Sequence, residues 1–193
     1  MKIHVICVAY KRTIPLRGLI DSFLLQTNPN WILYIVHDGK MPQGVKNVSE
    51  LYTDDRILFI ETEKRNGYYG HPNRKTTLET LPSCDDYVLM TNDDNYYVPR
   101  FVEFMLKPCG KDIGIVCCDV IHSHFDYNYH KSVLRENGID MGAFIVRLDV
   151  AKATGFNHVD FSADGKYAEQ CSKRCRRRGL ETIHIEKGLF VHN

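Results

Sequence analysis

The chain has 193 residues, of which 44% are hydrophobic and 25% are charged. It can therefore bury a full globular core, and disordered and collagen-like classes are excluded. Its 25 Lys and Arg against 24 Asp and Glu give a formal net charge of +1, which argues against nucleic acid as a partner. The sequence has no apolar run of about 18 residues, so we predict no integral membrane segment.

Cysteine usage and the start of the chain bear on location. The seven cysteines are odd in number and scattered, which is typical of reduced thiols in a cytosol-like compartment. Residues 1–6 lead directly into a strand-like segment and lack the long apolar stretch of a signal peptide. We therefore expect a cytoplasmic location, in a bacterial or host-cell cytosol, with peripheral attachment to a membrane left open.

The first elements predict a strand–helix–strand unit. Residues 3–9 form an almost unbroken apolar run, which favours a strand covered on both faces. We expect Thr13 to cap the next helix, which has Pro15 in its first turn and apolar residues at helical spacing. A second apolar strand follows at 31–36. Such a unit is the seed of a parallel sheet.

The rest of the chain continues this alternation after a polar stretch. We predict further strands at 57–60, 87–90, 113–121, 142–146 and 182–185. We predict further helices at 73–81, 99–106, 149–153 and 165–178. The segment 123–137 is polar and aromatic without a clear period, and it is long enough to be a functional loop or lid. The predicted fold is α/β with a mostly parallel central sheet.

Polar residues gather where the apolar strands end. In open parallel sheets, ligands bind at the carboxyl ends of the strands. Asp93 and Asp94 follow a buried strand and suggest a metal–diphosphate site, although a turn rich in Asp and Asn explains them equally well. Asp38 could accept a hydrogen bond from a base, and Tyr10 could stack on it. Taken alone, a turn and an aromatic residue at the sheet rim are the simpler interpretations.

Two other groups of Cys and His residues have spacings that could bind a metal ion. Cys171 and Cys175 are spaced i, i+4 and could bind zinc with His184, but they also fit an apolar helix stripe, and we favour core packing. His122 and His124 alternate at a strand end and could face one side. For these two we favour surface histidines over a role near an acceptor cleft.

Several motifs occur in a recognisable order over nearly the whole chain. They lie at residues 8–12, 21–27, 36–39, 92–94, 142–147 and 155–156. Their order and spacing resemble those of family-2 glycosyltransferases with the GT-A fold. The resemblance implies one GT-A-like domain over 1–193, with a nucleotide-sugar-binding half at about 1–98 and an acceptor-side half at about 99–193. It also implies that the chain could be the N-terminal domain of a longer protein.

The resemblance assigns roles to particular residues. It implies nucleotide-sugar binding by Tyr10, Arg12, Asp38, Arg74 and Asp93. It implies a metal site at Asp94 and His192, and a catalytic base at Asp164 with Asp160 as the rival. Three positions depart from the family pattern, since His37, Asn92 and Ala163 replace acidic residues.

The implied activity is inverting, metal-dependent transfer of a hexose from a UDP-sugar donor to a hydroxyl of a glycan or other acceptor. A site with both oxygen and nitrogen ligands favours Mn²⁺ over Mg²⁺. The first alternative is a non-catalytic nucleotide-sugar or glycan-binding module. The second is a sugar-nucleotide pyrophosphorylase, which would need a glycine-rich phosphate loop that residues 8–12 lack.

Overall fold

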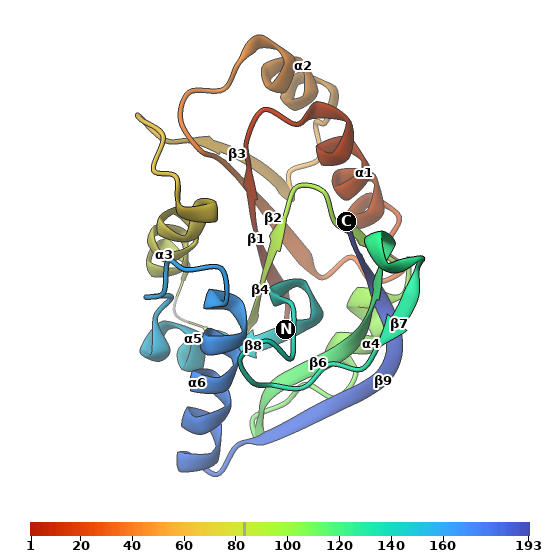
Figure 1. Cartoon of the computed structure of the whole chain (residues 1–193), viewed down its shortest axis with the longest axis vertical. Helices are drawn as coiled ribbons and strands as arrows, with labels where there is room; N and C mark the ends of the chain where they lie inside the picture. The colour runs from red at the N-terminus through yellow and green to blue at the C-terminus, as the bar shows by residue number, and fades with distance from the viewer. Residues whose placement is uncertain (83) are drawn as a thin grey trace.

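The computed structural model describes residues 1–82 and 84–193, and it is built around one nine-stranded sheet. The strand order is β3-β2-β1-β4-β8-β6-β9-β5, and β7 pairs with the outer part of β6. Most of the paired residues lie in the four parallel pairs, β1–β2, β1–β4, β2–β3 and β6–β9. The predicted α/β class with a mostly parallel sheet is confirmed (Figure 1).

The N-terminal half follows the predicted pattern closely. Its elements are β1 (Ile3–Ala9), α1 (Thr13–Leu24), β2 (Trp31–His37), α2 (Gln43–Leu51), β3 (Ile57–Glu61), η1 (Tyr68–Gly70), α3 (His71–Thr80) and β4 (Tyr87–Asn92). All seven residues of β1 are buried, because parallel neighbours flank it and helices cover both faces. Thr13 is the first residue of α1 and not its cap. The cap position is Arg12, which makes no capping side-chain hydrogen bond.

Helix α2 was not predicted from the sequence. Only Val45 and Val48 of this helix are buried, so its apolar face is two residues wide and the segment is otherwise polar. Pro42 precedes it in an extended conformation. Contacts with α1 stabilise this helix. A helix that depends on such tertiary packing and buries few residues gives no clear hydrophobic period in the sequence.

The C-terminal half begins after β4. Its elements are β5 (Tyr96–Tyr97), α4 (Phe101–Leu106), β6 (Ile113–His122), η2 (Ser123–Phe125), β7 (Asn128–His130), η3 (Met141–Ala143), β8 (Phe144–Arg147), α5 (Leu148–Thr154), α6 (Ala163–Arg177) and β9 (Glu181–His192). Strand β8 runs antiparallel to both β4 and β6 and so joins the halves. The last strand is longer than the predicted 182–185, because β9 stays paired with β6 through two bulges up to His192.

Helices lie on both faces of the sheet. Helices α1 and α2 pack together on one side, and α3, α5 and α6 lie on the other (Figure 1). Cys171 and Cys175 of α6 are fully buried, as core packing requires, and His184 binds Asp119 instead of a shared ion. No helix among the described residues is long and apolar enough to cross a membrane.

A buried glutamine fastens α1 to the start of the C-terminal half. The Gln26 amide nitrogen donates to the carbonyls of Ser22, 2.8 Å away, and Val98, 2.9 Å away. Its Oε1 accepts from the backbone N–H of Val102 at 2.9 Å. Gln26 lies two residues after the end of α1, and Val102 lies in α4.

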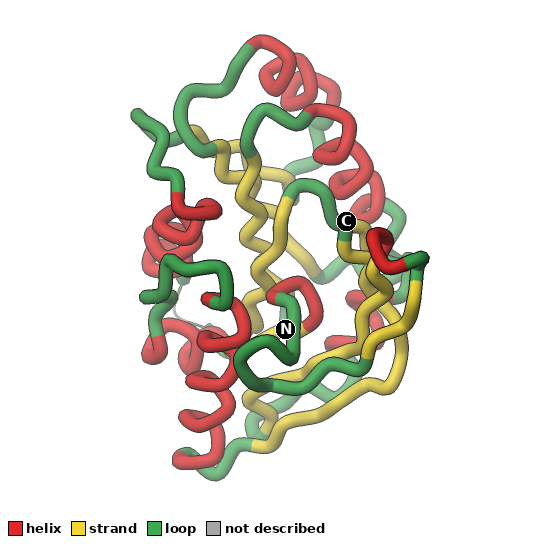
Figure 2. The backbone as a smooth tube through the Cα atoms, in the orientation of Figure 1, coloured by secondary structure: helices red, strands yellow, loops and turns green. Residues whose placement is uncertain are grey.

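The sheet directs five strand ends to one edge. Strands β1, β2 and β4 are mutually parallel, and the antiparallel β8 between β4 and β6 makes β6 and β9 point the same way. The carboxyl ends of these strands therefore meet, and the C-terminus of the chain lies beside the loop that follows β4 (Figures 1 and 2). This edge carries the predicted polar residues.

Candidate active site

Two adjoining cavities open at this edge. The smaller has a volume of about 400 Å³ and the larger about 560 Å³. They share Tyr69, Asn92 and His192 in their walls, so they meet at the ends of β4 and β9. A ligand bound in one cavity can therefore reach a ligand bound in the other.

The predicted residues are divided between the two cavities. The smaller one is lined by Tyr10, Arg12, Asp38, Asp94 and His192. The larger one is lined by Arg74, Asp164 and His192. Asp93 is fully buried beneath the smaller cavity and lines neither wall. The strand ends thus bring together residues from positions 10 to 193 of the sequence.

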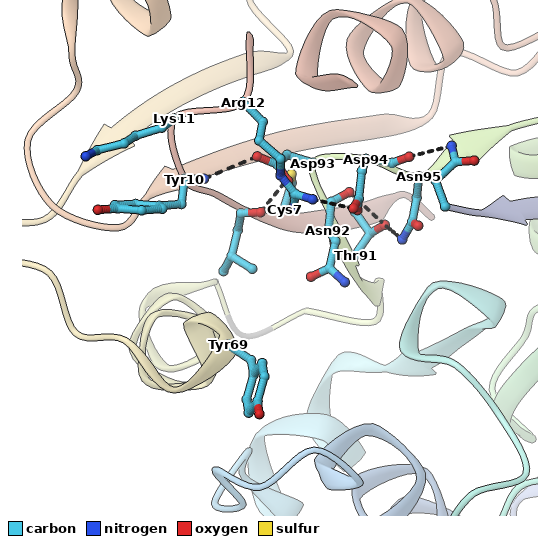
Figure 3. Close-up of polar contacts among 12 residues, drawn as sticks. Cys7, Tyr10, Lys11, Arg12, Tyr69, Thr91, Asn92, Asp93, Asp94 and Asn95 are labelled. Carbon is cyan, nitrogen blue, oxygen red and sulfur yellow. Dashed lines mark hydrogen bonds and ion pairs between the residues drawn. The ribbon is translucent and has the colours of Figure 1, made fainter. Parts of the chain in front are cut away.

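Arg12 bridges the two aspartates that follow β4. One guanidinium nitrogen binds the carboxylate of Asp93 and the other binds that of Asp94 (Figure 3). Burial raises the pKa of Asp93 to about 6, against the opposing attraction of Arg12 and the hydrogen bond from the Tyr10 N–H. Arg12 is therefore the cation that partly compensates the negative charge of this pair.

Asp94 retains one free acceptor. Its Oδ1 is buried and has no hydrogen-bond partner among the described residues, whereas Oδ2 binds Arg12. An orphaned buried carboxylate oxygen is a suitable ligand for a hard cation. His192 lies in the wall of the same cavity, and the side-chain amide of Asn193 donates to the Asp94 carbonyl at 2.7 Å. These residues fit a divalent cation.

Arg74 is a fully buried cation in the wall of the larger cavity. It donates to the carbonyls of Tyr69, at 2.7 Å, and Thr91, at 3.3 Å, and to the side-chain oxygen of Asn92. No carboxylate among the described residues forms an ion pair with it, and burial lowers its pKa to about 10. Asn92, which departs from the family pattern, supplies a neutral oxygen, so the negative charges that act on Arg74 come from more distant carboxylates such as Asp164 and Asp140.

Asp38 holds the loop that forms one wall of the smaller cavity. Its carboxylate accepts from the backbone N–H groups of Asn66 at 2.7 Å and Gly67 at 3.0 Å, and from the Asn73 side chain at 3.0 Å. Burial alone would raise the pKa of Asp38, but these three donors lower it. Gly70 closes this loop with a φ of +75°, and a Cβ there would lie 2.8 Å from Val8, so this position favours glycine.

The Tyr10 ring forms an aromatic floor beside this loop. It stacks on His37 with the ring centroids 5.9 Å apart. The Arg65 guanidinium lies 4.1 Å from its centroid. His37 also accepts from the Lys11 N–H at 3.2 Å and contacts the Gly39 carbonyl at 2.8 Å. His37, which replaces an acidic residue of the family pattern, thus contacts both the Tyr10 ring and the turn after β2.

Asp164 faces the larger cavity from the first turn of α6. It is mostly buried, and burial together with the negative charge of Asp140 raises its pKa to about 6. The hydrogen bond from the Gly165 N–H, at 3.1 Å, only partly offsets this. A carboxyl group with such a pKa is ionised at neutral pH and is a stronger base than an exposed carboxylate.

Asp160, the rival candidate, has a different environment. Its carboxylate accepts from Lys166 at 2.9 Å and from the Ser162 hydroxyl at 2.8 Å, and it does not line the larger cavity. Hydrogen bonds from Lys166 and Ser162 lower its pKa to about 2. This weakly basic, paired carboxylate is poorly placed to take a proton from a ligand in the cavity.

His192 connects the cavities and has a carboxylate partner. Its Nδ1 lies 3.1 Å from the Asp140 carboxylate. Burial disfavours the imidazolium, but Asp140 outweighs burial and raises the pKa of His192. His122, at the end of β6, stands beside it with the ring centroids 4.9 Å apart. The sequence interpretation favoured surface positions for His122 and His124. His124 is exposed, as expected, and contacts His192, whereas His122 is half-buried and lines the larger cavity.

Sequence reasoning missed Asp140, Arg65 and this histidine contact. Asp140 follows the irregular segment after β7, where no period marks a strand end. Arg65 precedes the Asn66-Gly67 turn, and only the folded loop brings it to Tyr10. The alternation of His122 and His124 was the one available signal for the cluster.

The fold is that of the GT-A glycosyltransferases. The chain belongs to glycosyl transferase family 2, whose family model matches residues 4–163. The uncharacterized glycosyltransferase YwdF of Bacillus subtilis (strain 168) is 28% identical over 123 residues, which cover 64% of this chain and 41% of YwdF.

Two solved structures are similar in fold. Residues 1–349 of S. aureus TarS in complex with UDP give a TM-score of 0.77 at 14% identity, covering all of this chain and 60% of that one. The mannosyltransferase PcManGT from Pyrobaculum calidifontis, in complex with GDP-Man and Mn²⁺, gives 0.71 at 16% identity, covering 99% of this chain and 56% of that one. The chain thus spans between 41% and 60% of the length of these relatives.

Proposed function

We propose that the protein is an inverting glycosyltransferase that moves a hexose from a UDP-sugar to a hydroxyl of a glycan or other acceptor. One observation carries the proposal. Two cavities meet at Asn92 and His192. One is lined by Tyr10, Arg12 and Asp38, and the other by Asp164, a shielded carboxylate of raised pKa. TarS has been solved with UDP and with UDP-GlcNAc, which supports a uridine donor for a chain of this fold.

The smaller cavity would hold the nucleotide. The base would stack on the Tyr10 floor and accept or donate hydrogen bonds at the Asp38 loop, where backbone and carboxylate groups are fixed in place. Asp93 would fix the Tyr10–Arg12 segment through its contacts to both residues. Arg74 and Arg12 would face the negative charge of the diphosphate.

Asp94 and His192 would hold the divalent cation. When bound, this ion would neutralise the charge that grows on the departing diphosphate. The nitrogen of His192 beside the oxygen of Asp94 favours Mn²⁺ over Mg²⁺. PcManGT has been solved with Mn²⁺, which supports a cation in this fold.

The larger cavity would hold the acceptor. The acceptor oxygen forms a bond to the anomeric carbon as the bond from that carbon to the diphosphate oxygen breaks. The electron pair leaves with the nucleoside diphosphate, and the acceptor proton passes to the Asp164 carboxylate. Attack from the face opposite the leaving group inverts the anomeric centre. The pKa of about 6 leaves Asp164 ionised at neutral pH for this step.

Nucleotide selection and product release test the proposal. UDP should bind more tightly than GDP, CDP or ADP in calorimetry, and Asp38→Asn should erode this preference because it weakens the Asn66–Gly67 loop. UDP release from a UDP-sugar should rise when glycan acceptors are added. Equal affinity for all four nucleotides would contradict the uridine assignment. Donor binding without release across an acceptor panel would favour the non-catalytic module.

A further inference from the structure

Three histidines from separate segments meet at the rim of the larger cavity. His122 ends β6, His124 lies in η2, and His192 ends β9. One ring nitrogen from each lies within 4.8 Å of those of the other two. The ring centroids of His124 and His192 are 5.1 Å apart, and those of His122 and His124 are 5.7 Å apart.

The backbone fixes this meeting point. His122 and His192 are register partners in the parallel pair of β6 and β9, so their rings are neighbours across the sheet. After His122 the chain turns back into β7 through Asp126 and Tyr127, which both have positive φ, 51° and 58°. This hairpin keeps His124 close to the two strand ends.

Two of the rings carry an unpartnered nitrogen. The Asp140 carboxylate lies 3.1 Å from His192 Nδ1, and its negative charge favours a cation at this end of the cavity. Nδ1 of His192 and Nδ1 of His122 are both buried and have no hydrogen-bond partner among the described residues. Both residues line the larger cavity, so a fourth coordination position would face water there.

The competing carboxylates offer a metal ion few free atoms. Arg12 binds both Asp93 and Asp94, so Oδ1 of Asp94 is the oxygen that an ion could use there without displacing the guanidinium. The histidine cluster carries no such competitor among the described residues. Three converging imidazole nitrogens therefore hold a divalent ion more firmly than this single oxygen does.

We propose that the nucleotide-free protein binds one divalent transition-metal ion of the zinc class through His122, His124 and His192. Imidazole nitrogens suit Zn²⁺, Co²⁺ and Ni²⁺, whereas Mg²⁺ prefers oxygen ligands. Zn–N bonds of about 2.1 Å require the nitrogens to draw together, which small side-chain rotations accomplish. His192 also belongs to the cation set proposed with the donor, so the two positions exclude each other, and donor binding would move the ion.

Cobalt spectroscopy tests this site without nucleotide or turnover. The purified chain is titrated with Co²⁺, which gives a visible d–d band when nitrogen ligands hold it in a tetrahedral site, and Zn²⁺ is then added to displace it. We expect one equivalent to produce the band and Zn²⁺ to abolish it. His122→Ala and His124→Ala should each weaken Co²⁺ binding at least tenfold. His158→Ala is the matched control, because His158 binds Gln170 away from the cluster.

Two results would overturn the proposal. A wild-type protein without the band would exclude the site, as would a band that survives both His122→Ala and His124→Ala. Asp94→Ala should leave the band intact, and its loss in that variant would place the ion at the carboxylates instead. Circular dichroism of each variant checks the fold. Since no donor is present, failure here leaves the proposed sugar transfer untouched, and failure of transfer leaves this site untouched.

Discussion

The two cavities are built differently, although they share a wall. The smaller is formed by residues that directly follow the buried parallel strands β1, β2 and β4, and its charged groups are paired with one another. The larger is formed largely by the irregular segment 130–141 and the start of α6, and its carboxylate Asp164 has no ion-pair partner among the described residues.

This difference matches the two tasks proposed for the site. A paired, rigid edge can bind a ligand with little rearrangement, because its donors and acceptors are already fixed. A shielded and unpaired carboxylate keeps a raised pKa and can take a proton. We therefore expect substitutions in the smaller cavity to change donor affinity and those in the larger to change the chemical step.

The largest effect is expected for Asp164→Asn. The amide is nearly isosteric and keeps an oxygen at the start of α6, but it cannot take the acceptor proton. Transfer should fall by about two to four orders of magnitude, with donor affinity unchanged. Initial rates of UDP release with acceptor, beside calorimetry with UDP, measure the two quantities.

Asp160→Asn is the matched control, because Asp160 is also acidic and lies four residues earlier but binds Lys166. It should transfer sugar at a rate near that of the wild type. If Asp160→Asn loses transfer and Asp164→Asn keeps it, the base is Asp160, and the proposed division between the cavities is wrong.

The next largest effect is expected for Asp94→Ala on the donor side. Removing the orphaned Oδ1 should lower Mn²⁺-dependent UDP affinity by about a hundredfold, since even supporting partners of a metal ligand contribute ten- to a hundredfold. Calorimetry with and without Mn²⁺ measures this. Asp85→Ala, an exposed aspartate at the other end of β4, is the control. Unchanged Mn²⁺ dependence in Asp94→Ala would remove this residue from the cation site.

A smaller effect concerns stability and pH. Asp164 has a pKa of about 6 in the folded chain, above its usual value near 4, so the folded state binds its proton more tightly than the unfolded state does. As the pH rises from about 4 to about 6, this group lowers the stability of the folded chain by about 3 kcal/mol in total. Asp164→Asn should therefore become more stable than the wild type across that window. Urea unfolding at pH 4, 5, 6 and 7 tests this, and a constant difference would contradict the assigned pKa.

The smallest effect is expected for Tyr10→Ala. Loss of a stacking floor typically removes about 1–3 kcal/mol per base, so UDP affinity should fall by roughly tenfold. Tyr10→Phe keeps the ring and should bind UDP normally. The transfer rate at saturating donor should stay close to that of the wild type in both variants. A Tyr10→Ala protein with unchanged UDP affinity would mean that the base does not rest on this ring.

The sequence predicts the residues of the smaller cavity better than those of the larger cavity, for a physical reason. The ends of β1, β2 and β4 follow unbroken apolar runs, so the sequence places Arg12, Asp38 and Asp94 at one edge, and the structure does so. Asp140 and Arg65 lie in loops whose course depends on tertiary contacts, and no periodicity marks them. Helix α2 was missed because only two of its residues are buried. The roles of all these residues stay predictions.

The Gln26 amide restricts how the site can open. It ties α1 to the backbone at Val98 and Val102, and leaving such buried groups unsatisfied costs about 1–3 kcal/mol each. A hinge that swings one half away from the other would have to break these bonds as well as the β4–β8 pairing. We therefore expect ligands to enter and leave through movements of the loops at the rim, chiefly residues 64–70 and 123–137, without separation of the two halves of the sheet.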